Sequence, residues 1–391
     1  MKRESWTKIN LPFKLRQPVL GLGADIKNSL CFAYRRCAFM SKAVNDLAMP
    51  ENFQKFKRQA ACINRHFGLS PRVIAYDSHP EYFSTKYILN FSRAKDVKPG
   101  NRTRLIPVQH HHAHIASCML ENKLKNQKVI GVAFDGTGFG GDSTLWGAEF
   151  LVADYQRFRR AAHLRYIPLV GGAKAVTQPW RVAAVWLCQV FGRRFLNLDL
   201  EFLKTIDKGN WAILERMRER NFNAPLASSI GRLFDAVAAL ILGIHQVRFE
   251  AEAAIRLEML ASEYKSRPRA YRFALKKREG VFIIDPSGVF RGIIADLKNK
   301  RNPAEIAAGF HLTVAQMISR TCLKINQDTR IKTVILSGGV FQNKLLLKLS
   351  QDLLEKEGFR IFTHSVLPCS DLSISLGQAV VAAFSGKFLC A

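Results

Sequence analysis

The sequence predicts an α/β fold built from two similar lobes with a cleft between them. Residues 19–34 and 129–153 share one pattern, in which an apolar strand, a turn with glycine and aspartate, and a second strand follow one another. Residues 333–358 instead indicate a buried strand, a Gly-Gly turn and an amphipathic helix. Strands that alternate with helices indicate α/β layers, and the repeated hairpin indicates two related lobes.

The turns of the two hairpins are candidate binding loops. The first turn holds Gly23 and Asp25, and the second, FDGTGFGGD over residues 134–142, places four glycines around Asp135 and Thr137. Because glycine has no Cβ, backbone N–H groups in such a loop can approach a phosphate closely. A glycine-rich turn is also a common end of a hairpin, so this pattern alone leaves a purely structural interpretation open.

Two further segments complete the expected elements. Residues 90–104 are basic and contain Gly, Asn and Pro, which predicts a linker in front of the second hairpin. Residues 302–325 have a helical pattern, in which Asn302 can cap the first turn and Pro303 suits it. We therefore expect a long helix before the last strand-turn-helix segment.

The composition indicates a globular chain with an unusual charge. Of its 391 residues, 48% are apolar and 23% are charged, which argues against a wholly disordered chain. The 59 Lys and Arg exceed the 31 Asp and Glu, so the formal net charge is +28. The longest apolar run, residues 236–244, is shorter than the roughly 20 residues that span a bilayer, and the N-terminus lacks a secretory signal. We therefore expect a cytoplasmic protein without a membrane partner.

The positive charge indicates polyanionic partners. The run from Lys265 to Arg278 has the highest local density of positive charge, and residues 1–104 are basic as well. Such surfaces attract RNA or an acidic protein. Because no nucleic-acid-binding module accompanies the charge, nucleic acid stays open as a partner but is not favoured.

The sharpest single motif is a histidine cluster, VQHHHAHIAS over residues 108–117. His110 and His114 are four residues apart, so a helix would present both imidazoles on one face. This arrangement suits two nitrogen ligands of a divalent metal such as zinc or iron. Two histidines do not complete a site, and Asp135 and Asp371 are candidates for the missing carboxylates. None of the eight cysteines forms a C-x-x-C pair, which disfavours zinc-ribbon and thioredoxin-like sites.

The segment SGGVFQN over residues 337–343 is a candidate nucleotide site. Gly338 and Gly339 would let an adenine or a ribose lie against the backbone, and Asn343 could hydrogen-bond it. A tight strand-to-helix turn would show the same pattern, so the segment alone decides nothing. The chain lacks the Walker A, Rossmann and nucleophile-elbow motifs, which disfavours those three classes of enzyme.

Taken in chain order, the motifs resemble one family. The segments are VQHHHAHIASCM, GVAFDGTGFGGDSTLWGAEFL, GGAKAVTQPWR, SSIGRLFDAVAAL, IAAGFH, LSGGVFQN and DLSISLGQA. They resemble the C-terminal transferase region of the HypF carbamoyltransferases of nickel–iron hydrogenase maturation, over residues 18–385. The resemblance implies a duplicated actin-like fold (ASKHA, RNase H-like) with a nucleotide cleft between the lobes. It divides the chain into the first hairpin lobe and linker (1–104) and a TsaD-like catalytic region (105–391).

The resemblance also implies roles for single residues. His110, His114 and Asp371 match metal ligands, and Asp135 matches a catalytic position beside the metal and phosphate. His111 and its neighbour match no ligand position, and His111 is expected to support the ligands or to face the substrate as a catalytic residue. The residues expected to bind the nucleotide are Gly136, Thr137, Gly138, Asp235, Gly338, Gly339 and Asn343.

The implied reaction moves a carbamoyl group from carbamoyl-adenylate, which is made with ATP, to a cysteine thiolate of a HypE-like acceptor protein. The family's acylphosphatase-like and YrdC-like domains have no counterpart in these residues, so a separate protein with those activities is an expected partner. Several motif residues differ from the family, among them Ala173, Ala251 and Leu372. The alternatives are a transferase that resembles the tRNA threonylcarbamoyl transferases, or an inactive remnant that binds only nucleotide or a partner.

Overall fold

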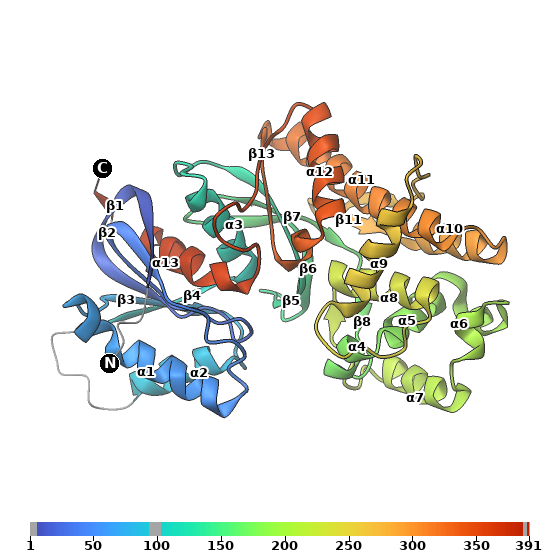
Figure 1. The fold of residues 1–391 in the computed structure, drawn as a ribbon, viewed down its shortest axis with the longest axis horizontal. Helices are drawn as coiled ribbons and strands as arrows, with labels where there is room; N and C mark the ends of the chain where they lie inside the picture. The colour runs from blue at the N-terminus through green and yellow to red at the C-terminus, as the bar shows by residue number, and fades with distance from the viewer. Residues whose placement is uncertain (1–5, 94–102, 386–388, 391) are drawn as a thin grey trace.

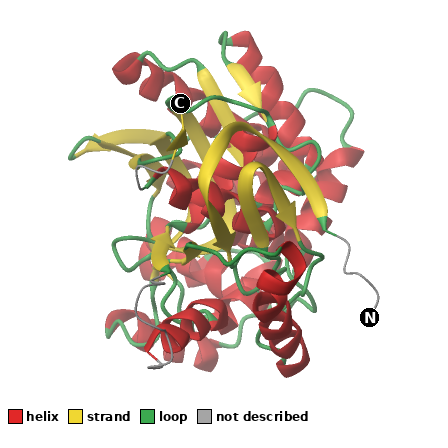
Figure 2. Ribbon diagram, turned by 90° about the vertical axis from the view of Figure 1, so that its left-hand side faces the viewer, coloured by secondary structure: helices red, strands yellow, loops and turns green. Residues whose placement is uncertain are grey.

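Two β-sheets lie next to each other in the protein, and helices flank the strands (Figures 1 and 2). The computed structural model describes residues 6–93, 103–385 and 389–390. The N-terminal third of the chain builds the first sheet, and most of the remaining strands build the second. The expected α/β architecture is confirmed.

The first sheet is formed by the strands β1 (Thr7–Gly21), β2 (Cys31–Met40), β3 (Val73–Asp77), β4 (Arg104–Val108) and β14 (Leu389–Cys390). β1 and β2 form the expected antiparallel hairpin, with Val19 opposite Ala33. β3 pairs with β1 in parallel, and β4 pairs with β3 in parallel.

The second sheet is formed by the strands β5 (Val129–Phe139), β6 (Leu145–Ala153), β7 (Phe158–Leu164), β8 (Ile167–Pro168), β9 (Leu226–Ala227), β10 (Ala274–Arg278), β11 (Val281–Asp285), β12 (Thr333–Ser337) and β13 (Arg360–Phe362). Its main order is β10-β11-β7-β6-β5-β12-β13. β5 and β6 form the second antiparallel hairpin, with Ala133 opposite Glu149. β12 pairs with β5 in parallel, and β13 pairs with β12 in parallel.

Both sheets therefore repeat one plan, an antiparallel hairpin followed by two parallel strands. In the first sheet the parallel strands are β3 and β4, and in the second they are β12 and β13. This repetition confirms the two related lobes that the similar hairpins predict.

The helices are α1 (Pro50–Phe67), α2 (Phe83–Arg93), α3 (His110–Glu121), α4 (Ala173–Thr177), α5 (Pro179–Phe191), α6 (Glu201–Lys204), α7 (Lys208–Glu219), α8 (Ile230–Leu242), α9 (Glu252–Glu263), α10 (Ser287–Lys298), α11 (Pro303–Thr329), α12 (Lys344–Lys356) and α13 (Ile374–Phe384). The side chain of Asn302 caps α11, as expected, by accepting from the N–H of Ala304. No helix in the described ranges is both long and apolar enough to cross a bilayer.

Helices α3 and α13 each pack on the sheet of the other lobe. α3 follows the last strand of the first sheet but packs on β5 and β12, whereas α13 follows the second sheet but packs on β1 and β3. The two helices meet so closely that a Cβ on Gly377 would lie 1.9 Å from the backbone oxygen of Ala113. One apolar core runs through this contact and joins residues of both sheets.

The expected boundary at residue 104 falls at the first residue of β4, which pairs with β3 along its whole length. The linker expected over residues 90–104 overlaps regular structure at both ends, because α2 continues to Arg93 and β4 begins at Arg104. Residues 94–102 lie outside the described part of the chain.

The close contact of α3 and α13 gives a testable prediction for stability. Gly377→Ala should lower the free energy of unfolding by about 1–3 kcal/mol, because the added Cβ would overlap backbone atoms that have no room to move. Urea unfolding followed by circular dichroism measures the change. The control is Gly141→Ala, since a Cβ at Gly141 has no neighbour within 4 Å. Equal stability of the two variants would contradict the close packing.

Candidate functional site

The histidine cluster forms the first turns of α3, at the carboxyl end of β4. Gln109 caps the helix by accepting from the backbone N–H of His112 at 2.9 Å. The four histidine side chains are all buried, so they do not form an exposed cluster on the surface. The first turns of α3 therefore hold these imidazoles inside the molecule, and the helix expected from the i,i+4 spacing of His110 and His114 is present.

Two histidines and two aspartates converge in one group that could hold a metal ion: His110, His114, Asp135 and Asp371. The Nε2 atoms of His110 and His114 lie 3.4 and 3.2 Å from one carboxylate oxygen of Asp135. They lie 3.8 and 3.6 Å from an oxygen of Asp371. Metal–ligand bonds of about 2.0–2.2 Å in a tetrahedron separate neighbouring donor atoms by about 3.4 Å. The spacing and the donor types therefore fit a divalent metal such as zinc or iron.

Asp77, at the end of β3, orients one of these ligands. Its carboxylate lies 2.8 Å from Nδ1 of His110, and both side chains are almost fully buried. This contact fixes the proton on Nδ1 and turns the lone pair of Nε2 toward the other ligands. Nδ1 of His114 is buried without a hydrogen-bond partner, so only one of the two imidazoles is held in this way.

Charge in the group determines how it holds protons. Burial by itself lowers the pKa of His110, but Asp77 and Asp135 outweigh burial and raise it well above the usual range. Burial is likewise outweighed at His114 by Asp135 and Asp371, which raise its pKa. The two imidazoles in turn outweigh the effect of burial on Asp135 and hold its pKa well below the usual range. The metal-free group therefore holds protons on its imidazoles opposite ionised Asp135.

The loop that carries Asp371 is anchored to the end of α3. Nδ1 of His364 lies 2.7 Å from Glu121, and the backbone N–H groups of Ser365 and Val366 donate to the same carboxylate. Burial raises the pKa of Glu121, but these partners outweigh it and bring the pKa to about 2. The ionised carboxylate of Glu121 thus fixes the part of the loop that precedes Asp371 in the chain.

Two glycines in the loops beside the site have no space for a side chain. A Cβ on Gly138 would lie 2.6 Å from the ring of His111 and 2.9 Å from the ring of His110. Gly338 has φ 102° and passes so close to β5 that a Cβ would lie 2.3 Å from the backbone oxygen of Phe134. These two positions therefore require glycine for close packing of the loops against α3 and β5.

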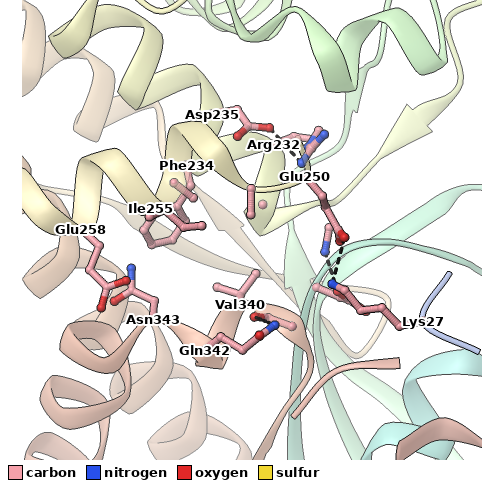
Figure 3. Close-up of a pocket in the computed structure, with 16 residues that line it drawn as sticks. Lys27, Arg232, Phe234, Asp235, Glu250, Ile255, Glu258, Val340, Gln342 and Asn343 are labelled. Atoms are coloured by element: carbon pink, nitrogen blue, oxygen red, sulfur yellow. Dashed lines mark hydrogen bonds and ion pairs between the residues drawn. The ribbon is translucent and has the colours of Figure 1, made fainter. Parts of the chain in front are cut away.

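A cavity of about 300 Å³ opens beside Asp135 (Figure 3). It is lined by Lys27, Asp135, Gly136, Gly231, Arg232, Phe234, Asp235, Glu250, Ala251, Ala254, Ile255, Glu258, Gly339, Val340, Gln342 and Asn343. Lys27 comes from the turn after β1 and pairs with Glu250 at 2.9 Å, so this ion pair joins elements of both lobes. A cavity of this size between lobes, with a few polar groups on apolar walls, is typical of a small-molecule site.

Four of the seven expected nucleotide residues line this cavity: Gly136, Asp235, Gly339 and Asn343. Thr137, Gly138 and Gly338 belong to the same loops but are not part of the lining. The amide of Asn343 already caps α12 through Leu346 and lies 3.0 Å from His311. Asp235 is buried and pairs with Arg232 at 2.9 Å, and burial raises its pKa despite that partner.

His111 does not face the cavity in this conformation. Its side chain is fully buried, its Nδ1 lies 3.1 Å from the amide nitrogen of Gln109, and its ring lies 6.0 Å from that of Trp146. Burial and the neighbouring His110 lower the pKa of His111 well below the usual range. His111 is thus an enclosed imidazole whose ring packs 5.4 Å from that of His110.

No sequence motif predicted a role for Asp77, for the pair of Glu121 and His364, or for the pair of Lys27 and Glu250. Asp77 directly follows a short apolar strand, and a carboxylate at the end of a parallel strand is the one signal that could have found it. The two ion pairs join residues 243 and 223 positions apart, which no local pattern reveals.

The first prediction from this geometry concerns metal affinity. His110→Ala and His114→Ala should each remove most of the bound zinc, and Asp77→Asn should weaken binding about 10–100-fold because it removes the group that orients His110. His111→Ala is the control and should keep most of the metal. Metal analysis after gel filtration checks this, and equal losses in all four variants would contradict the assignment.

The second prediction concerns pH. Because the pKa values of His110 and His114 are raised, protons compete with the metal at neutral pH. Affinity should therefore rise with pH through and above about 6.5, by up to about tenfold per pH unit for each proton displaced. A chelator competition series measures it, and an affinity independent of pH would contradict a site made of these imidazoles.

Comparisons with known proteins identify the family of the chain. A model described as "HypF Kae1-like domain" matches residues 14–121, and one described as "Carbamoyltransferase, Kae1-like Domain, second subdomain" matches residues 131–378. The carbamoyltransferase HypF of Synechocystis is 33% identical over 98% of this chain and 49% of its own length. A carbamoyltransferase HypF homolog of Cupriavidus necator is 34% identical over 94% of this chain and 91% of its own.

Among solved structures, full-length HypF in its phosphate- and nucleotide-bound form superposes with a TM-score of 0.89 and 36% identity, over 98% of this chain and 48% of that one. The chain thus spans about half the length of the Synechocystis relative and of this structure, but nearly all of the Cupriavidus homolog. Identity above 30% along nearly the whole chain shows common descent, and the chain therefore belongs to the HypF carbamoyltransferase family.

Proposed function

We propose that this chain transfers a carbamoyl group from carbamoyl-adenylate to a cysteine thiolate of a HypE-like protein in the maturation of nickel–iron hydrogenase. The observation that carries the proposal is that Asp135 belongs both to the metal-binding group and to the lining of the cavity. A ligand in the cavity would therefore lie directly against the metal position. The phosphate- and nucleotide-bound form of a HypF relative supports a nucleotide as that ligand.

In this proposal His110, His114, Asp135 and Asp371 hold a divalent metal, which supplies Lewis acidity and a fixed position for phosphate or carbamoyl oxygens. The ligands are imidazole nitrogen and carboxylate oxygen, so zinc and iron both suit the group. Asp77 and His111 act behind the ligands, by orienting His110 and by filling the space beneath the glycine loop.

The cavity would hold the adenylate. Gly136 and Gly339 offer backbone without side chains next to Asp135, and Asp235 offers a further carboxylate in the lining. Thr137, Gly138 and Gly338 shape the same loops. Because its amide is already bonded to the protein, Asn343 would act by holding the start of α12 in place.

The reaction then needs an acceptor from outside. The thiol of the acceptor cysteine loses its proton to solvent, the thiolate sulfur bonds to the carbamoyl carbon, and the bond from that carbon to the phosphate oxygen breaks. AMP leaves with the electron pair of that bond. The contribution of this chain is to bind the adenylate, orient it and stabilise charge on the leaving oxygen. A separate YrdC-like and acylphosphatase-like protein would supply the carbamoyl-adenylate.

The positions that differ from the family pattern are compatible with binding. Leu372, where the resemblance implies a glycine, lies in a short 3₁₀ turn and is not among the residues with positive φ, so a side chain introduces no backbone strain there. Ala251 does adopt φ 63°, which costs about 1 kcal/mol in a residue with a Cβ. Ala251 is also one of the residues that line the cavity.

The test is a transfer assay with the purified, metal-loaded chain, ATP, an independent source of carbamoyl-adenylate and a HypE-like acceptor. We expect the acceptor to gain the mass of one carbamoyl group on its cysteine. Asp371→Asn should abolish the gain, whereas the surface variant Asp352→Asn should keep it. No gain of mass with the unaltered chain, although ATP binds, would contradict transfer and support the inactive, nucleotide-binding alternative.

A second acceptor class is favoured by one observation, the net charge of +28. A transferase that resembles the tRNA threonylcarbamoyl transferases would use such charge to bind the phosphate backbone. Replacing the acceptor protein with tRNA in the same assay distinguishes the two. We expect no modification of tRNA, because no base-stacking module accompanies the charge.

A further inference from the structure

A second cavity lies at the far edge of the second sheet. It has a volume of about 340 Å³ and is lined by His163, Arg165, Tyr166, Lys276, Arg278, Ile283 and Asp285. These residues come from β7 and the turn after it and from the hairpin of β10 and β11. Lys276 and Arg278 end the basic run from Lys265 to Arg278 that the sequence singles out. β7 and β11 are next to each other in the middle of Figure 1.

The pairing of the strands places this cavity on the same face as the metal-binding group. One row of opposite residues crosses the sheet through Ala133, Glu149, His163, Ile283 and Lys276. Opposite residues on paired strands point to one face, and the row begins two residues before Asp135 on β5. The second cavity therefore lies two to four strands away from the metal group, on the same face of the sheet.

The charges around the cavity are positive and largely unpaired. Its one carboxylate, Asp285, is already bonded to Arg165 at 3.3 Å and to Ser287. Lys276 and Arg278 are exposed, and neither has a carboxylate partner among the residues that the structure describes. Converging positive side chains around a concave, low-dielectric wall concentrate the field and attract anions.

Two less exposed side chains complete the wall. His163 is only 7% exposed, and its Nδ1 is bonded to the backbone oxygen of Leu164, which leaves Nε2 as its second polar atom. The ring of Tyr166 packs 4.8 Å from that of His163. The cavity thus has a buried imidazole as well as guanidinium and ammonium groups, and they come from three strands and a turn rather than from one charged segment.

The wall is also linked to the glycine loop of the first site. The hydroxyl of Tyr166 donates to Asp142 at 2.6 Å, and Asp142 also accepts from Thr144 and from the indole of Trp146. Asp142 ends the FDGTGFGGD segment that begins beside Asp135. An anion held by this wall would therefore contact the residues that fix the far end of that loop.

We propose that this second cavity is a binding site for a phosphate group of a small ligand. Two guanidinium groups and one ammonium group surround it from several sides, which suits an acceptor with three or four oxygens and a double negative charge. The volume suits a phosphorylated small molecule. Lys277, on the same strand, points to the other face of the sheet and pairs with Asp328 at 2.6 Å, so it takes no part in the site.

The test is calorimetric titration of the full chain with inorganic pyrophosphate at about 150 mM ionic strength, where weak surface attraction is screened. Lys276→Ala and Arg278→Ala should each weaken binding about tenfold, the size of one lost charge-assisted hydrogen bond. Lys277→Ala is the matched control, because it removes the same charge from the same strand and should leave the affinity unchanged. Gln342→Ala, in the first cavity, should also leave this binding unchanged.

The outcomes separate the phosphate site from other roles of the charge. Equal weakening by Lys276→Ala and Lys277→Ala, or no saturable binding, would overturn the proposal. The charges would then only protect the edge strand β10 from pairing with another chain. If tRNA binds, is displaced by pyrophosphate and is weakened by Lys276→Ala but not by Lys277→Ala, the site stands and its phosphate comes from nucleic acid. If tRNA leaves pyrophosphate binding unaffected, the ligand is a small molecule.

Discussion

The close crossing of α3 and α13 is the constraint on which the rest of the structure depends. Each helix follows the sheet of one lobe and packs on the sheet of the other, and the contact between Gly377 and Ala113 leaves no room for a side chain. The crossing fixes where the two lobes meet. It also places the first turns of α3, which carry His110 and His114, beside the turn that carries Asp371.

The crossing of α3 and α13 also brings the group that could hold a metal next to the first cavity. Asp135 lies on β5 between the imidazoles of His110 and His114 and the cavity, so its carboxylate belongs to both the metal-binding group and the cavity lining. The same packing determines the charges around Asp135. The buried imidazoles lower the pKa of Asp135, and the neighbouring carboxylates raise the pKa of His110. Metal and nucleotide would therefore bind as neighbours that share one ligand, and the binding of each should affect the other.

Much of the fold and of the metal group could be predicted from the sequence, because both depend on local patterns. The hairpins at 19–34 and 129–153 have strand periodicity with glycine turns, and the i,i+4 spacing of His110 and His114 is a property of one helix. Asp77 ends a strand that the sequence indicates, but its contact with His110 depends on which strands pair. The pairing of Lys27 with Glu250 and the wall of the second cavity depend on segments far apart in the chain, which no short segment encodes. His111 shows the opposite failure, since a motif names the residue but only packing shows that it is enclosed.

The most direct test of the shared carboxylate is the affinity for ATP of the full chain with and without bound zinc, measured by calorimetry. If Asp135 joins the two sites, zinc should change the affinity about 5–150-fold, the usual range for coupled sites, and ATP should change zinc affinity by the same factor. Asp371→Asn, which removes a ligand outside the cavity lining, should reduce that factor. An ATP affinity that is the same with and without zinc would contradict the account.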